Sequence, residues 1–212
     1  MNGEKYCNIY LVRHGHSEGN ANDIFGTDPQ LTDIGRQQAK ELAMQLDGIH
    51  FDAVFSSTLT RAKQTAEIIA LERKIAVQTS ELLKERHWGE FEGKIQKQVI
   101  KELGYLFEKA KTLTKKERAS FRLAPQIETE EEMMSRFITA LREIAVAYAD
   151  KTVLIVSHQY ILRLFLLHIG YLTIESFYET GLDNSGFINI ESDGIEFNVK
   201  EIQGIRKGKR LY

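Results

Sequence analysis

Residues 8–20 read Asn8-Ile9-Tyr10-Leu11-Val12-Arg13-His14-Gly15-His16-Ser17-Glu18-Gly19-Asn20. The apolar run that ends at Val12 is rich in strand-forming residues, and a polar loop with two glycines follows it. Ligands of α/β proteins are held at the carboxyl ends of the strands. The stretch therefore predicts a strand that delivers Arg13 and His14 to a site for an anion and for nucleophilic or acid–base chemistry.

The length and composition indicate an ordinary globular protein. With 212 residues the chain is most simply one domain, residues 1–212, and it is long enough to bury a sizeable core. The hydrophobic content is 42%, and the net charge of -2 gives no reason to expect nucleic acid as a partner. One cysteine, Cys7, cannot build a disulfide framework or a cysteine-rich zinc site.

Targeting and membrane segments are not expected. Residues 1–5 lack the apolar stretch of a signal peptide, and no run approaches 18 apolar residues. The sequence therefore predicts a cytoplasmic protein without a membrane partner. The basic residues 206–210 at the end of the chain are expected to fray.

Strands and helices alternate along the sequence. Besides the first strand, strands are expected at 51–55 and 152–156, with a short edge strand at 75–79 and a hairpin across 188–199. This order, with helices between the strands, predicts an α/β fold: a three-layer α/β/α sandwich around a mostly parallel central sheet.

The helices that cover this sheet have recognisable beginnings. Thr32 and Ser57 are expected to cap two of them, and Thr129 and Glu132 form a capping box for a third. The nearly all-apolar segment 161–168 predicts a buried helix.

One segment differs in character from the rest. Residues 94–122 hold nine Lys or Arg against three Glu, within a long helical region from about Ile95 to Leu123. We expect a helical cap at approximately 94–127, placed over the sheet, with a solvated helical hairpin as the alternative. The basic charge suggests a substrate that carries a second anionic group or a polar body.

Two histidines occupy equivalent places in this pattern. His14 follows the strand that ends at Val12, and His158 follows the strand that ends at Val156. If these strands are neighbours in a parallel sheet, both imidazoles emerge at the same edge. Arg61 is expected in the first turn of a helix that also begins at a strand end, where phosphate is attracted.

A carboxyl group completes the candidate site. Glu85 lies in a loop that is expected to close over the strand ends, near the apolar ring of Trp88. A carboxyl group in such a place is suited to general-acid catalysis. Glu90 and Glu92 are rivals for this role on sequence alone.

Several segments together resemble the signature of the histidine phosphatase superfamily, the phosphoglycerate mutase-like proteins, over about residues 6–165. In order, they are residues 13–20 (R-H-G-x-[ST]-x-x-N), 28–35 (D-x-x-L-T-x-x-G), 56–66 (S-S-x-L-x-R-A-x-x-T-A), 83–93 (L-x-E-x-x-x-G-x-x-E-G) and 156–158 (the V-S-H of V-S-H-G). The resemblance implies a phosphoglycerate mutase-like fold. It leaves the cap and the last strands unmatched in detail.

The resemblance also implies a role for each matched position. His14 would attack phosphorus and become a phosphohistidine, and Glu85 would protonate the leaving oxygen and then assist the hydrolytic water. The phosphoryl group and its transition-state charge would be held by Arg13, Asn20, Arg61 and His158. The candidate binding residues further include Gly26, Thr27 and Gln159. No metal and no cofactor are expected, because the arginines and His158 neutralise the phosphoryl oxygens.

Three departures from the family pattern bear on the activity. Gln159 follows the second histidine where the family usually has Gly, and the Gly-Asn that mutases tend to have there is absent. Gly19 stands where mutases usually carry Trp. In the other direction, residues 86–89 are close to a mutase-like R-H-Y-G. The balance favours a phosphatase over a mutase.

The sequence thus predicts a metal-independent phosphomonoesterase that hydrolyses a small phosphorylated metabolite through a phosphohistidine. One alternative is a cofactor-dependent phosphoglycerate mutase, and a second is a phosphate-binding module without turnover. The expected partner is the small-molecule substrate. The oligomeric state stays open, with a homodimer as one option.

Overall fold

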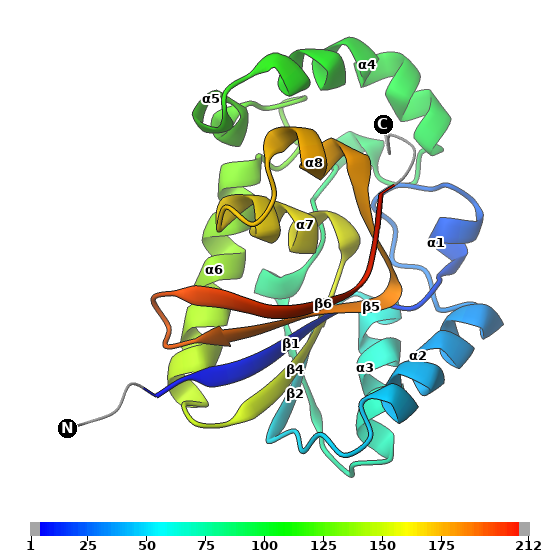
Figure 1. The fold of residues 1–212 in the computed structure, drawn as a ribbon. Coiled ribbons are helices and arrows are strands. Elements are labelled where there is room, and N and C mark those ends of the chain that lie inside the picture. Colours follow the sequence, from blue (N-terminus) through cyan, green and yellow to red (C-terminus); the bar gives the residue numbers. More distant parts are fainter. Residues whose placement is uncertain (1–4, 208–212) are drawn as a thin grey trace.

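A six-stranded sheet with helices on both faces organises residues 5–207, the part of the chain that the computed structural model describes (Figure 1). The strands are β1 (Cys7–Arg13), β2 (Ala53–Ser57), β3 (Val77–Ser80), β4 (Thr152–Ser157), β5 (Thr180–Ser192) and β6 (Phe197–Lys207). Their order is β3-β2-β4-β1-β5-β6; the first four are parallel, and β5 runs antiparallel to both of its neighbours. The predicted three-layer α/β/α sandwich is confirmed.

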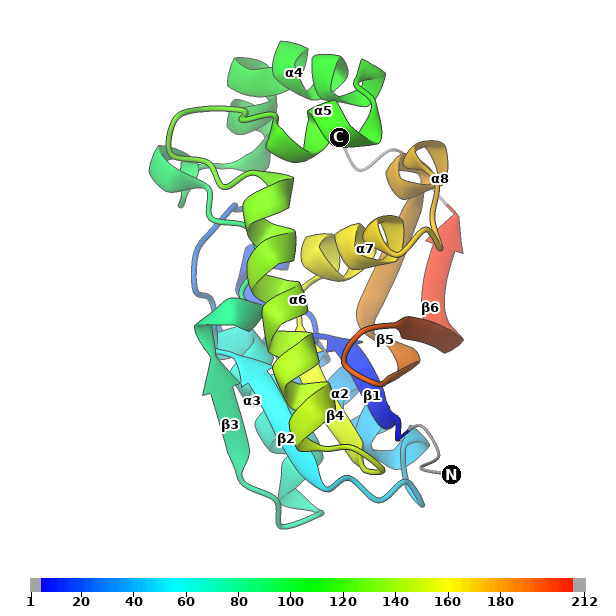
Figure 2. The same ribbon diagram turned by 90° about the vertical axis from the view of Figure 1, so that its left-hand side faces the viewer.

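The helices divide between the two faces of this sheet (Figure 2). One face is covered by α2 (Asp33–Gln45) and α3 (Thr60–Leu71), and the other by α6 (Glu130–Ala147), α7 (Gln159–His168) and α8 (Ile174–Glu179). Short turns lie in the loops: α1 (Glu18–Ala21), η1 (Glu81–Leu83) and η2 (Gly89–Phe91). No helix within residues 5–207 combines the length and the apolar character needed to cross a bilayer.

The register between β1 and β4 positions the two histidines. Val12 pairs with Val156 and Arg13 with Ser157, so His14 and His158 are the next residues along two adjacent parallel strands. Both strands are buried between the helix layers, and Val12 and Val156 are fully covered. The predicted neighbourhood of the two strand ends is therefore confirmed.

Two of the three predicted helix N-caps are confirmed by the structure. Thr32 caps α2, and the Thr129–Glu132 capping box begins α6, as predicted. The prediction for Ser57 is wrong: it is the last residue of β2, which pairs with Ser80 of β3, and α3 begins at Thr60. Pairing with a further strand extends β2 beyond the apolar run on which the prediction rested.

The hairpin and the chain end also differ from expectation. Ile195 lies in the turn and is exposed, because β6 begins only at Phe197. Arg206 and Lys207 do not fray but pair with Gly181 and Thr180 of β5. Residues 208–210 of the predicted basic tail lie outside the described residues.

The segment predicted as a cap contains α4 (Gln96–Thr112) and α5 (Lys115–Ser120), which lie together at one end of the molecule (Figures 1 and 2). Val99 and Leu103 of α4 pack in an apolar cluster that also contains Trp88, Phe91, Leu123 and Ile127, and α5 contacts α6 through the Arg118–Glu130 pair. Apolar burial of this kind holds the segment in place without making it part of the sheet core.

Two glycines of the matched motifs allow α2 to approach the loop after β1. A Cβ on Gly35 would lie 1.9 Å from the carbonyl oxygen of His16, and a Cβ on Gly15 would lie 2.4 Å from the carbonyl oxygen of Gly35. Neither position can hold a side chain unless the backbone moves. The first turn of α2 thereby supports the backbone that carries His14.

Gly35→Ala is expected to lower the free energy of unfolding by about 2 kcal/mol, because the new methyl group overlaps backbone atoms that cannot move independently. Urea unfolding measures this change. Gly104→Ala is the matched control: nothing lies within 4 Å of a Cβ there, in the middle of α4. The control is expected to gain up to about 1 kcal/mol from helix propensity. Equal effects of the two substitutions would contradict the proposed close approach.

Candidate active site

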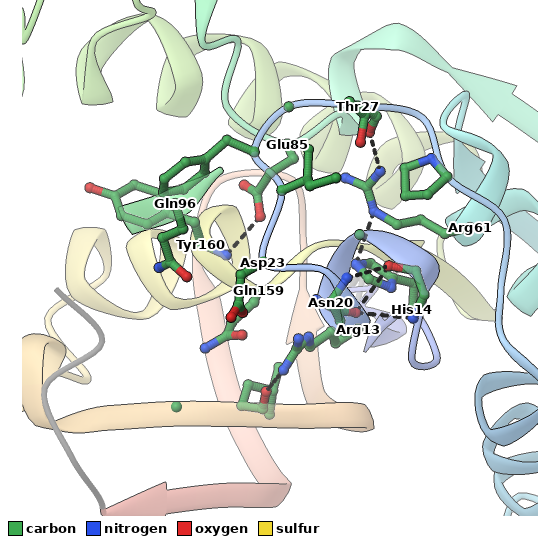
Figure 3. Close-up of a pocket in the computed structure, with 18 of the residues that line it drawn as sticks. Arg13, His14, Asn20, Asp23, Thr27, Arg61, Glu85, Gln96, Gln159 and Tyr160 are labelled. Carbon is green, nitrogen blue, oxygen red and sulfur yellow. Dashed lines mark hydrogen bonds between the residues drawn. The ribbon is translucent and has the colours of Figure 1, made fainter. Parts of the chain in front are cut away.

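A pocket of about 490 Å³ opens where β1 and β2 end (Figure 3). Its wall comes from the end of β1, the loop between β1 and α2, the first turn of α3, the loop after η1, the starts of α4, α7 and β5, and the end of β6. Eight of the sequence-predicted residues line it, namely Arg13, His14, Asn20, Gly26, Thr27, Arg61, Glu85 and Gln159. The structure thus brings together candidates that are up to 146 residues apart in the sequence (159 − 13).

His14 is held in one orientation by both ring nitrogens. Its Nδ1 lies 2.7 Å from the carbonyl oxygen of Gly15, and its Nε2 lies 3.1 Å from Nε of Arg61. A ring that donates from Nδ1 to the carbonyl keeps the lone pair on Nε2, which can accept from the guanidinium. Burial, followed by the charges of Arg61 and Arg13, holds the pKa of His14 well below its usual range. The imidazole is therefore neutral at neutral pH.

Arg61 lies between His14 and the loop that carries Thr27, as Figure 3 shows. Its Nη1 donates to the carbonyl oxygen of Thr27 at 2.8 Å. Burial lowers the pKa of Arg61, but a guanidinium stays protonated at neutral pH. A largely buried cation thus stands beside the neutral histidine.

The beginning of α3 does not supply the anion site that the sequence suggested. The carboxylate of Asp28 accepts hydrogen bonds from the backbone N–H and the hydroxyl of Thr60, the first residue of the helix. A carboxylate is the natural partner of a helix N-terminus, so it occupies the groups that a phosphate would use. What α3 contributes to the pocket is the side chain of Arg61.

Arg13 and Asn20 are both held by neighbours in the chain or in the sheet. Nη1 of Arg13 donates to the carbonyl oxygen of Leu182 in β5. The side-chain oxygen of Asn20 accepts from the backbone N–H and the hydroxyl of Ser17, each at 3.1 Å, in the capping box of α1. This leaves the amide nitrogen of Asn20 as its donor group for a ligand.

His158 stands beside His14 but is fully covered and does not line the pocket. The two ring centroids lie 5.2 Å apart. Nε2 of His158 is 2.8 Å from the hydroxyl of Ser57, while its buried Nδ1 forms no hydrogen bond within residues 5–207. Burial, and then Arg61, lowers the pKa of His158 well below its usual range, so this ring is neutral as well.

Glu85 lies at the N-terminus of α7. One of its carboxylate oxygens accepts from the backbone N–H of Tyr160 at 2.9 Å, and the other from that of Ile161 at 3.1 Å. Its loop is held by Arg136 of α6, which donates to the carbonyl oxygens of Leu82, Lys84 and Glu85. Of the three carboxyl groups that the sequence offered, Glu85 lines the pocket, and Glu90 and Glu92 do not.

Other residues of the site were not singled out by sequence reasoning. Thr65 accepts the backbone N–H of Gly15 at 3.0 Å, which ties α3 to the loop of His14. Asn184 of β5 donates to the carbonyl oxygen of His14 at 3.1 Å. The matched motif 56–66 contained a signal for Thr65, but nothing local marks Asn184, because its contact depends on the pairing of β5 with β1.

The outer part of the pocket is polar and carries both signs of charge. Asp23, Gln96 and Gln159 lie to the left in Figure 3, and Arg61 to the right. Arg206 also lines the pocket, where it pairs with Asp183 at 2.7 Å. The nine basic residues of 94–122, all within the described part of the chain, do not line it. The basic charge of the cap is therefore not part of this pocket, and the expected second anionic group or polar body of the substrate stays a prediction.

Known proteins are similar to this chain in sequence and in fold. The sequence model of the histidine phosphatase superfamily (branch 1) matches residues 9–203. The chain is 30% identical over 197 residues to an uncharacterized phosphatase, PhoE, of Bacillus subtilis, covering 91% of this chain and 92% of that protein. It is 32% identical over 167 residues to a 2,3-bisphosphoglycerate-dependent phosphoglycerate mutase of Cytophaga hutchinsonii, covering 76% of each.

A solved structure agrees with these relatives. YhfR of Bacillus stearothermophilus superposes with a TM-score of 0.80 at 28% identity, over 93% of this chain and 96% of that one. The matched family model, the relatives and the shared fold lead to one conclusion: the chain belongs to the histidine phosphatase superfamily.

Proposed function

We propose that the protein is a metal-independent phosphomonoesterase that hydrolyses a small phosphorylated metabolite through a phosphohistidine at His14. The observation that carries this proposal is the state of His14: a neutral imidazole, fixed through Nδ1, with its Nε2 lone pair beside a buried guanidinium. A nucleophile needs that lone pair, and an incoming phosphoryl group needs that cation. The phosphatase among the relatives supports the same activity.

The groups of the pocket can carry out both steps. In the first, Nε2 of His14 forms a bond to phosphorus as the ester P–O bond breaks, and the carboxyl group of Glu85 gives its proton to the leaving oxygen. In the second, water attacks phosphorus, Glu85 takes a proton from it, and the P–N bond breaks to release inorganic phosphate. Arg13 and Arg61 balance the charge of the phosphoryl oxygens throughout.

Asn20 and His158 complete the proposed phosphoryl site. The amide nitrogen of Asn20 is the donor left after Ser17 has occupied its oxygen. The buried Nδ1 of His158 makes no hydrogen bond within the described residues, whereas buried polar atoms are normally satisfied. A phosphoryl oxygen bound next to His14 would supply this partner once the ring of His158, which is fully covered in this structure, turns toward the pocket.

The pocket is larger than a phosphate group requires. Its volume of about 490 Å³ leaves room for a small organic body beside the phosphate. Asp23, Gln96 and Gln159 offer hydrogen bonds to such a body. These features support a small, polar, phosphorylated metabolite as the substrate.

A phosphoglycerate mutase is the second candidate, and the similarity to a mutase of Cytophaga hutchinsonii favours it. One contact weighs against it: a Cβ on Gly19, where mutases usually carry Trp, would lie 2.9 Å from Cγ of Pro29. Interconversion of phosphoglycerates, stimulated by a bisphosphoglycerate primer and faster than hydrolysis, would establish the mutase instead.

The proposed function predicts hydrolysis of 4-nitrophenyl phosphate in excess EDTA, with a phosphate on the protein that is labile to acid and stable to base. His14→Ala is expected to lower kcat/KM about a thousandfold or more, because no nucleophile remains. His16→Gln is the control, since His16 lies 3.0 Å from the hydroxyl of Thr32 and does not line the pocket. Full activity of His14→Ala would refute the mechanism, and phosphate binding without turnover would indicate a binding module.

The buried histidines predict how stability changes with pH. The pKa values of His14 and His158 are lowered in the folded protein, so above the ordinary histidine pKa of about 6.5 neither state binds the proton and the pair contributes no pH dependence. Below that pH the two histidines bind protons in the unfolded chain but stay unprotonated in the folded protein. The free energy of unfolding is then expected to fall by about 1.4 kcal/mol per pH unit for each histidine.

Urea unfolding in phosphate-free buffer between about pH 7.5 and pH 5.5, which spans the ordinary histidine pKa, measures this slope. His14→Asn removes one of the two titrating groups. The slope of the free energy of unfolding against pH should therefore be smaller in the variant, by about 1.4 kcal/mol per pH unit, which corresponds to one proton. The same slope in the variant and in the wild-type protein would show that His14 is not held neutral.

A further inference from the structure

The sequence motifs assign no role to Tyr160, yet this residue joins two parts of the structure. Its backbone N–H donates to a carboxylate oxygen of Glu85 at 2.9 Å. Its hydroxyl, at the other end of the residue, donates to a carboxylate oxygen of Glu130 at 2.6 Å. Tyr160 is the second residue of α7 and follows the candidate site residues His158 and Gln159 directly.

Glu130 in turn is held by the cap segment. The same oxygen accepts from Nε and Nη2 of Arg118, at 2.9 and 2.7 Å. Glu130 is the first residue of α6 and Arg118 belongs to α5, and their exposed fractions are only 8% and 2%. Charge-assisted bonds in such a covered place have well-defined geometry, so the tyrosine hydroxyl meets a rigid acceptor.

The ring of Tyr160 is also enclosed. The guanidinium of Arg86, the residue after Glu85, lies 5.4 Å from the ring centroid, and the ring of Phe177 packs edge-on at 5.5 Å. Burial, and then the charge of Glu130, raises the pKa of Tyr160, so its hydroxyl keeps the proton that it donates. The side chain therefore has one orientation, and the first turn of α7 is tied to it.

We propose that Tyr160 is a positioning residue for Glu85. Its hydroxyl anchors the first turn of α7 to the Glu130–Arg118 pair, and the backbone N–H groups of that turn hold the carboxyl group that we assign as proton donor. This inference rests on the proposed function and deepens it. It makes the cap segment part of the support of the proton donor, through a chain of hydrogen bonds from Arg118 to Glu85.

Tyr160→Phe tests this inference because it removes the hydroxyl alone. The ring and the backbone N–H remain, so the protein keeps its packing while α7 loses its anchor. A misplaced proton donor matters most when the leaving group is a poor one, since a good leaving group departs without a proton. The sign of a positioning role is therefore an effect that depends on the leaving group.

The experiment compares kcat/KM for two esters that differ by one nitro group, 4-nitrophenyl phosphate and phenyl phosphate. This parameter reports the step that breaks the ester bond, whereas kcat also contains the hydrolysis of the phosphohistidine. Tyr160→Phe is expected to lower kcat/KM about tenfold for phenyl phosphate and at most about twofold for the nitrophenyl ester. Glu85→Gln should likewise lower kcat/KM more for phenyl phosphate than for the nitrophenyl ester, and the loss should be larger than with Tyr160→Phe.

Tyr148→Phe is the matched control. The hydroxyl of Tyr148 accepts from Gln78 at 3.4 Å, at the far end of α6, and the residue does not line the pocket. Both esters should be hydrolysed by this variant as by the wild-type protein. Equal losses on the two esters with Tyr160→Phe, or no loss on either, would overturn the inference.

The Glu85→Gln variant separates this inference from the function on which it rests. If Glu85→Gln discriminates between the esters and Tyr160→Phe does not, the positioning role alone is wrong. If Glu85→Gln affects both esters equally, Glu85 is not the proton donor, and that part of the proposed function is overturned together with the inference.

Discussion

The parallel pairing of β1 with β4 is the constraint on which the site depends. The register Val12 to Val156 and Arg13 to Ser157 makes His14 and His158 the next residues along neighbouring strands, with their rings 5.2 Å apart. Cys7, Ile9 and Leu11 of β1 are buried in the apolar cluster on one face of the sheet, and a slip of one residue would move them to the other face, so the register is strongly specified. The close approach of Gly15 and Gly35 then supports the backbone beyond β1.

The electrostatics of the pocket follow from this placement. Two covered imidazoles stand next to Arg61, and burial together with that cation keeps both of them neutral. Two carboxyl groups lie at helix N-termini next to the pocket: Asp28 at the start of α3 and Glu85 at the start of α7. The positive charge of the pocket therefore comes from guanidinium groups, while N–H groups at the N-termini of α3 and α7 already bind carboxyl groups.

Glu85 is the group that depends most on distant parts of the chain. Its loop is held from α6 by Arg136, and its carboxylate is held from α7 by Tyr160 and Ile161. The cap segment reaches the same helix through the buried pair of Arg118 and Glu130. Its basic residues do not line the pocket, so what the cap adds near the site is the side chain of Gln96 and the contact to α7.

The sequence by itself determined the layered fold and most of the candidate site. Strand ends at Val12 and Val156, the capping box at Thr129 and the order of the motifs are local signals, and the fold puts their residues where those signals predict. The tertiary structure alone decided that β2 continues to Ser57, that Asp28 takes the N-terminus of α3, and that Arg206 reaches the pocket already paired with Asp183. Each of these three features depends on contacts between residues far apart in the sequence. Several groups could bind the same N–H group or carboxylate, and only the folded structure shows which one does. Hydrophobic periodicity records which face of an element is buried, and it carries no information about that competition.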